Sequence, residues 1–167
     1  MFYKHFYLLP IVSCALFFMS CQRLPDVQGE GSPFLQGLWT QDSSINNMEL
    51  LSYTKHKFKI TCDSFYVDMT TYSKVNYYAD SCFQNGIWKE YAKGVYIVRE
   101  DTVFLDGTYT KADYKQKISG CYHVGRYIKS FKIKKSGDDR LLLESTDNQR
   151  ELSLMLREKI TCVPKEL

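Results

Sequence analysis

The sequence predicts an all-β protein with a mostly antiparallel sheet and little helix. Aromatic residues make up 15% of the chain. Runs in which apolar and polar residues alternate are separated by short groups of Gly, Asn, Asp and Ser, which is typical of half-buried strands. Many short strands with one apolar face each fit a closed up-and-down barrel or a sandwich, because an open sheet leaves the amides of its outer strands unpaired.

The first 21 residues are predicted to form an export signal. Lys4 precedes an apolar run from Phe6 to Met19, which is followed by Ser20 and Cys21. Such a run before a small residue and a cysteine is typical of bacterial lipoproteins, in which the segment before the cysteine is removed and its thiol carries lipid. A plain cleaved secretory signal is the alternative. A membrane-spanning helix is disfavoured because the run has only 14 residues and contains Pro10, whereas a span needs about 20.

Removal of residues 1–20 leaves a mature chain of 147 residues, a length that suits one domain. Residues 21–32 are polar and rich in Gly and Pro, so we expect a flexible lipid tether there and a single domain over residues 33–167. Gln22 stands where an Asp would indicate retention in the inner membrane, which favours lipid anchoring at the outer membrane of the cell envelope. Loss of Lys4 lowers the formal net charge from +3 to +2, which gives no indication of nucleic-acid binding.

Alternation places most of the strands. Residues 57–61 alternate, and after Cys62-Asp63-Ser64 the alternation resumes in another phase over residues 65–69, which marks a turn or a bulge. Polar groups at 99–102 and 136–139 separate alternating runs and predict two hairpins. Residues 152–157 alternate again and predict a final strand.

Three segments have less regular patterns. Residues 43–56 fit either a helical turn or a strand, and residues 112–114 are expected to form a short helical turn. Residues 70–87 are polar and aromatic, with Asn85-Gly86 as a turn, and we expect them to form a long loop that borders a site.

Several stretches of this chain resemble one known family. Gly37-Leu38-Trp39 is similar to the Gly-x-Trp opening of lipocalin-like (calycin) barrels, in which the tryptophan plugs the closed end. Residues 88–96, 101–109 and 120–127 are similar to small lipocalin-like lipoproteins of Bacteroidetes. The resemblance covers nearly the whole mature chain. It implies an antiparallel up-and-down lipocalin-like barrel, with Gly37 and Trp39 packed at one end, but no established molecular activity.

Some relatives bear the label fumarate hydratase. Iron-independent fumarases are long helical tetramers with a Gly-Ser-Ser-x-Met-Pro loop, and nothing in this chain resembles that loop. Iron-sulfur fumarases need three cysteine ligands in a large multi-domain chain. We therefore do not expect fumarate hydratase activity.

Four cysteines remain after signal removal and lipidation: Cys62, Cys82, Cys121 and Cys162. An even number in an exported domain indicates two disulfides, for which three pairings are possible. We favour Cys62 with Cys82, which closes a local ribbon, and Cys121 with Cys162, which ties a middle strand to the C-terminal segment. Either Cys62 or Cys82 could instead pair with the C-terminal segment.

The sequence gives little support for catalysis or metal binding. His56 and His123 are the imidazoles of the mature chain, and neither lies in a nucleophile motif. No two cysteines have the close spacing of a zinc site. The carboxylates are scattered and are expected at the surface or in turns, among them Asp63, Asp68, Asp80, Glu90 and Asp106. We therefore expect a noncatalytic monomer without a cofactor or a metal.

Aromatic residues between 66 and 96 are the best candidates for a ligand- or partner-binding surface. Tyrosine offers a large flat face with a polar tip, although cross-strand pairing on a sheet uses the same property. The candidates are Tyr66, Tyr72, Tyr77, Tyr78, Trp88, Tyr91 and Tyr96.

Two functions fit these features. The preferred one is binding of a small apolar or amphipathic ligand by the barrel, with the tyrosine-rich loop as a lid. The other is a protein-interaction module, such as an envelope assembly component or an inhibitor of a protease or lysozyme. A barrel packed solid with side chains would favour the second.

Overall fold

The computed structural model describes residues 28–42 and 50–165. The predicted signal, the predicted lipidation site Cys21 and residues 22–27 lie outside the described residues. Within them, no helix is long and apolar enough to cross a membrane. The elements follow one another as η2 (Pro33–Leu35), β1 (Gly37–Gln41), β2 (Ser52–Thr61), β3 (Ser64–Ser73), α2 (Asp80–Phe83), η4 (Gln84–Gly86), β4 (Ile87–Arg99), β5 (Thr102–Thr110), β6 (Arg126–Ser136), β7 (Arg140–Ser145) and β8 (Glu151–Lys159).

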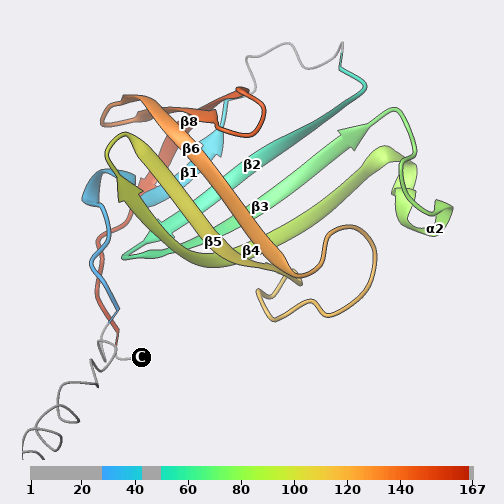
Figure 1. The fold of residues 1–167 in the computed structure, drawn as a ribbon, viewed down its shortest axis with the longest axis horizontal. Helices are drawn as coiled ribbons and strands as arrows, with labels where there is room; N and C mark the ends of the chain where they lie inside the picture. The colour runs from blue at the N-terminus through green and yellow to red at the C-terminus, as the bar shows by residue number, and fades with distance from the viewer. Residues whose placement is uncertain (1–27, 43–49, 166–167) are drawn as a thin grey trace, which may run out of the picture.

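The strands form one closed barrel (Figure 1). Each strand pairs antiparallel with the next one in the chain, and β8 pairs antiparallel with β1 to close the sheet. The predicted all-β, antiparallel up-and-down barrel with little helix is therefore confirmed, and a sandwich is excluded. This architecture is compatible with a lipocalin-like fold.

The loops lie at two ends of the barrel because consecutive strands run in opposite directions. One end, which we call the base, holds the short turns at 62–63, 100–101 and 137–139. The other end, which we call the open end, holds the connections at 74–86, 111–125 and 146–150, together with the described residues 42 and 50–51 beside β1 and β2. The base is thus formed by tight hairpins, and the long loops gather at the open end.

The predicted hairpins are confirmed. The polar groups at 99–102 and 136–139 connect β4 to β5 and β6 to β7, and the phase change at Cys62-Asp63 is the turn between β2 and β3. Residues 52–56 begin β2, whereas residues 43–49 of the ambiguous segment lie outside the described residues. Residues 112–114 form a turn closed by a hydrogen bond from Tyr114 N to Lys111 O of 2.9 Å, and not a helix.

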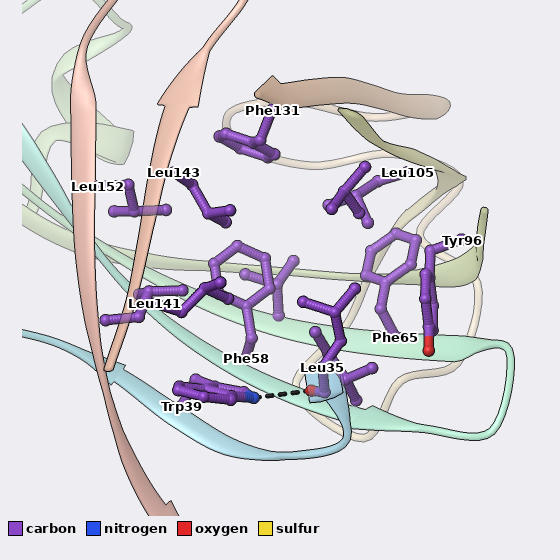
Figure 2. Close-up of a cluster of buried hydrophobic side chains, with 14 of the residues drawn as sticks. Leu35, Trp39, Phe58, Phe65, Tyr96, Leu105, Phe131, Leu141, Leu143 and Leu152 are labelled. Atoms are coloured by element: carbon purple, nitrogen blue, oxygen red, sulfur yellow. Dashed lines mark hydrogen bonds between the residues drawn. The ribbon is translucent and has the colours of Figure 1, made fainter. Parts of the chain in front are cut away.

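Side chains fill the barrel from the base to the middle (Figure 2). Inward positions alternate along each strand, as in β3, where Phe65 and Val67 are 0% exposed. Burial of one such side chain stabilises the fold by about 1.5–3 kcal/mol. The buried cluster comprises Leu35, Trp39, Phe58, Ile60, Phe65, Val67, Met69, Ala92, Tyr96, Val103, Leu105, Tyr127, Phe131, Leu141, Leu143, Leu152 and Leu154.

The segment before β1 packs against the base. Leu35 and Trp39 are each 1% exposed, and the Trp39 Nε1 donates a buried hydrogen bond of 2.7 Å to Leu35 O (Figure 2). Gly37, also buried, begins β1 between them. The chain contacts the barrel from Gln28 onward, five residues before the predicted start of the domain: the Ser32 N donates to the Tyr96 hydroxyl at 2.8 Å.

The structure pairs the four cysteines as Cys62–Cys162 and Cys82–Cys121. The favoured pairing of Cys62 with Cys82 and Cys121 with Cys162 is therefore wrong. Cys62 lies in the β2–β3 turn at the base, where the chain passes after β8, whereas Cys82 and Cys121 lie in open-end loops. A ten-residue strand such as β3 is about 33 Å long, and a disulfide requires Cα atoms within about 7 Å, so a bridge cannot join the two ends.

The backbones of β4 and β5 approach each other closely at a pair of glycines. Gly94 and Gly107 are cross-strand partners, and a Cβ on Gly94 would lie 2.2 Å from Asp106 O and 2.4 Å from Gly107 Cα. Because both obstacles are backbone atoms, rotamer changes cannot relieve the clash. Both glycines also line a hollow of about 460 Å³ on the outer wall.

We predict that Gly94→Ala lowers the free energy of unfolding by about 2–4 kcal/mol, because the strands must separate to admit the methyl group. Gly137→Ala is the matched control: its Cβ would come no nearer than 3.7 Å to another residue, and its effect should stay within about 0.5 kcal/mol. Urea denaturation followed by circular dichroism measures both. Equal effects of the two substitutions would show that the close approach is not a constraint.

Candidate functional site

Two long loops are joined at the open end. The β3–β4 loop (74–86) contains α2 and η4, and the Cys82–Cys121 disulfide links it to the β5–β6 loop (111–125), with Cα atoms 5.5 Å apart. Gly86 has a φ of +81°, and a Cβ there would lie 2.1 Å from Ser73 O. Glycine therefore permits the tight return of the loop into β4.

Three aromatic rings, which we call the aromatic cluster, pack between these loops and β4. The ring of Trp88 on β4 stacks on that of Tyr122 at 4.8 Å between centroids, and Tyr78 meets both edge-on at 5.6 and 5.0 Å. Trp88 is only 4% exposed. Ring pairs of this kind each add about 0.5–1.5 kcal/mol beyond their burial, so the cluster holds both loops against the barrel.

A buried carboxylate lies one inward position further along β4. Glu90 is 7% exposed. Its carboxylate accepts hydrogen bonds from Trp88 Nε1 at 3.3 Å and from His123 N at 3.0 Å, and its Oε1 lies 2.9 Å from His123 Nδ1. His123 also stacks on Tyr109 at 5.0 Å. A buried carboxylate without donors would cost several kcal/mol, so Glu90 fixes the β5–β6 loop by requiring His123 in place.

The tyrosines around Glu90 keep their protons at neutral pH. Burial raises the pKa of Tyr109 to about 12, and the charges of Glu90 and Tyr78 add to the effect. Burial and the Glu90 charge likewise raise the pKa of Tyr78. These hydroxyls can donate hydrogen bonds but are not prepared as bases. Within the described residues, the buried Tyr122 Oη and Thr110 Oγ1 have no hydrogen-bond partner.

Inward positions of β1, β2 and β6 toward the open end are polar as well. The Gln41 Oε1 accepts from His56 N at 3.0 Å and lies 3.1 Å from His56 Nδ1. Burial lowers the pKa of His56 to about 4, and the Lys129 charge acts in the same direction. The Lys129 ammonium pairs with Asp147 at 2.7 Å. His56 is thus neutral at pH 7 and serves as a hydrogen-bonded wall residue.

The residues predicted for one binding surface are divided among several places. Tyr78 and Trp88 belong to the aromatic cluster, and Tyr77 is 63% exposed in the same loop. Tyr72 faces outward and stacks on Tyr53 at 5.0 Å. These positions share the open-end half of the barrel.

The remaining predicted residues lie elsewhere. Tyr66 and Tyr91 project from the outer wall and contact Tyr114 with centroids 5.0 and 6.2 Å away, and the Tyr114 hydroxyl donates to Asp68. Tyr96 faces inward near the base and is 3% exposed. Alternation along β4 separates Tyr91 from Tyr96, because odd and even positions of one strand face opposite sides. Along β3 the odd positions face inward, so Tyr66 faces outward.

Sequence reasoning missed the role of one residue of β5 and two residues of the β5–β6 loop. Tyr109, Tyr122 and His123 complete the arrangement around Glu90, although the sequence had marked Glu90 only as a scattered carboxylate. The signal that could have found them is the cysteine pair, because Cys121 directly precedes Tyr122 and His123. A Cys82–Cys121 bridge brings this tripeptide to the tyrosine-rich loop.

The site offers binding surface more readily than reactive groups. The carboxylate and both imidazoles hydrogen-bond to their neighbours, and no group of three or more His, Cys, Asp or Glu side chains among the described residues is placed to hold a metal ion. No family model, no curated protein and no solved structure matches this chain. Its function must therefore be argued from its own geometry.

We predict that Glu90→Gln destabilises the fold by about 2 kcal/mol, because the amide nitrogen of glutamine faces N–H donors and leaves at least one unsatisfied. Hydrogen exchange at the His123 amide should accelerate at least tenfold. Asp106→Asn is the control, since this carboxylate pairs with Arg126 at the surface, both side chains being more than half exposed, and such pairs contribute at most about 1 kcal/mol. Unchanged exchange at His123 would contradict the role of Glu90.

We predict that His56 makes the protein less stable as the pH falls. The unfolded imidazole binds its proton near pH 6.5 and the folded one only near pH 4, so the unfolded state binds more protons between these values and is favoured there. The free energy of unfolding should fall with a slope of up to about 1.4 kcal/mol per pH unit. In His56→Gln this contribution should vanish in urea titrations at pH 4.5, 5.5 and 7, whereas an identical slope would contradict it.

Proposed function

We propose that this protein is a noncatalytic, lipid-anchored binding protein of the cell envelope that recognises a protein partner with its open end. The observation that carries the proposal is the interior, which side chains fill from the base to the middle. Seventeen buried side chains occupy the barrel. The hollow of about 460 Å³ at Gly94 and Gly107 and the hollow of about 490 Å³ at Leu38 and Lys59 both lie on the outer wall. This favours surface recognition over the alternative of a small apolar or amphipathic ligand held inside.

The open-end loops expose apolar side chains on a fixed framework. Tyr77 is 63%, Ile118 80% and Val124 46% exposed, all on the two loops joined by the disulfide. The Glu90 hydrogen bonds and the aromatic cluster further restrict these loops. Because little conformational entropy is left to lose, a partner can use most of the contact free energy for affinity, and exposed tyrosine is a favoured contact residue.

The predicted anchor would present the open end away from the membrane. Seven residue steps separate Cys21 from Gln28, which spans at most about 25 Å when fully extended. Gln28 lies at the base, where it donates to Lys165 O at 2.8 Å. The segments before β1 and after β8 run side by side from that end (Figure 1). The 13-residue strand β4 spans about 40 Å and carries the open end outward.

The proposed class is that of the small lipocalin-like lipoproteins of Bacteroidetes, located at the outer membrane. The barrel supports this proposal only at the level of the fold, and the motifs at Gly37-Leu38-Trp39 and residues 88–96 supply the rest. An inhibitor or an assembly component fits a small stapled barrel with one rigid binding end.

The partner can be located by site-specific photo-crosslinking in intact cells. A photoreactive residue replaces Tyr77 or Ile118 at the open end and, as controls, Val95 or Ile97, which are 53% and 46% exposed on the outer wall. We expect a defined protein adduct from the open-end positions. Tyr77→Ala and Ile118→Ala should then each weaken binding of the identified partner at least tenfold, with Val95→Ala unchanged.

Two outcomes would contradict the proposal. One is equal crosslinking from the wall and the open end. The other is a small molecule that stays bound to the native protein in one-to-one ratio and is lost when interior residues such as Phe58 are changed conservatively.

A further inference from the structure

A second hollow, on the outer wall at the base, has features of a binding site. Its volume is about 490 Å³. One side is the barrel wall, to which β1, β2, β3 and β8 contribute Leu38, Lys59, Tyr66 and Glu158. The other side is the C-terminal segment, which contributes Val163 and Lys165. We call this hollow the base groove.

The wall residues form one row across four strands. Glu158 is the cross-strand partner of Leu38, Leu38 that of Lys59, and Lys59 that of Tyr66. Neighbouring strands are about 4.8 Å apart, so the backbones at Glu158 and Lys59 are about 10 Å apart. The row therefore places an acid and a base on either side of an apolar residue.

The charged groups of the base groove do not neutralise one another. Among the described residues, neither Lys59 nor Lys165 forms an ion pair, and Glu158 forms none either. A short zwitterion could contact both Lys59 and Glu158, with its anionic group toward Lys59 and its cationic group toward Glu158.

The far side of the base groove is held in place covalently. The Cys62–Cys162 disulfide ties the C-terminal segment to the β2–β3 turn. Gln28 bridges this segment to β3, because its N donates to Lys165 O at 2.8 Å and its Nε2 donates to Ser64 Oγ at 2.7 Å. Val163, 74% exposed, lies on this fixed segment. The groove thus combines an apolar lining with fixed charges of both signs.

We infer that the base groove binds the headgroup of a zwitterionic phospholipid with a primary ammonium group, phosphatidylethanolamine, in the bilayer that holds the anchor. The inference rests on the lipid anchor of the proposed function but not on its protein partner. The phosphate contacts Lys59 and Lys165, the ammonium donates to Glu158, and the upper acyl chain contacts Leu38 and Val163. The bilayer is the expected source because Gln28, which lines the groove, is at most about 25 Å of chain from Cys21.

The test is native mass spectrometry of the full, acylated protein in detergent, with phosphatidylethanolamine, phosphatidylglycerol or phosphatidylcholine added in equal amounts. We expect one retained phosphatidylethanolamine, held at least tenfold better than the other two lipids. Lys59→Ala should reduce its retention at least tenfold. Glu158→Gln should remove the preference over phosphatidylglycerol, which has no ammonium group.

Lys89→Ala and Glu151→Gln are matched controls, because both side chains are exposed on strand residues toward the open end and should leave retention unchanged. The same spectra report whether Cys21 is acylated. An acylated protein that retains the three lipids equally, or whose retention survives Lys59→Ala, overturns the headgroup site and leaves the open-end surface intact. A protein without acyl chains overturns both the anchor and this site.

Discussion

The fold depends on β1, a strand of five residues that must pair on both sides. Without it the sheet would have two open edges, along β2 and β8, with unpaired amides exposed to other chains. Its small number of backbone hydrogen bonds is supplemented by side chains: Trp39 reaches into the core and its indole N–H binds the carbonyl of Leu35 just before the strand. The same short segment therefore both closes the barrel and packs its base.

Because the predicted anchor precedes β1 in the chain, a force on the anchor would reach the barrel through the segment before β1. A pull on the N-terminal segment acts first on the contacts of Gln28 and Ser32 with Ser64 and Tyr96. The Cys62–Cys162 bridge lies beside these contacts and joins the β2–β3 turn to the C-terminal segment. Disulfides stabilise mainly by restricting the unfolded chain, and this one, with a sequence separation of 100 residues, encloses most of the barrel.

Period-two alternation located parts of β2 to β8 but not β1, and it left residues 70–73 of β3 in an expected loop. Alternation shows only which positions of one strand share a face. It could not find the disulfides, because these depend on which end of the barrel each loop occupies. In an up-and-down barrel that is fixed by the number of preceding strands: Cys62 follows β2 and Cys162 follows β8, both at the base, whereas Cys82 follows β3 and Cys121 follows β5. Because the number of strands between residues 43 and 87 was uncertain from the sequence, the end of the barrel that each cysteine occupies could not be deduced.

The same reasoning explains why the candidate site was found only in part. Tyr78 and Trp88 stood out as aromatics, but Glu90 acquires its role from His123, 33 residues later, and no local pattern connects them. A buried carboxylate becomes informative only once its donors are known. Conversely, the tyrosine density between 66 and 96 misled because adjacent strands distribute such residues to the inside, the outer wall and the loops.

The two ends of the barrel can act independently because its strands separate them. If the proposed lipid anchor were the only membrane contact, the domain could rotate about it and the open end would sample many directions. A second contact at the base would restrict that rotation and raise the effective concentration of the open end toward partners on the far side. Such a division of roles requires tight turns and a disulfide-linked terminus at one end and long, disulfide-linked loops at the other, and this barrel, filled from the base to the middle, has both.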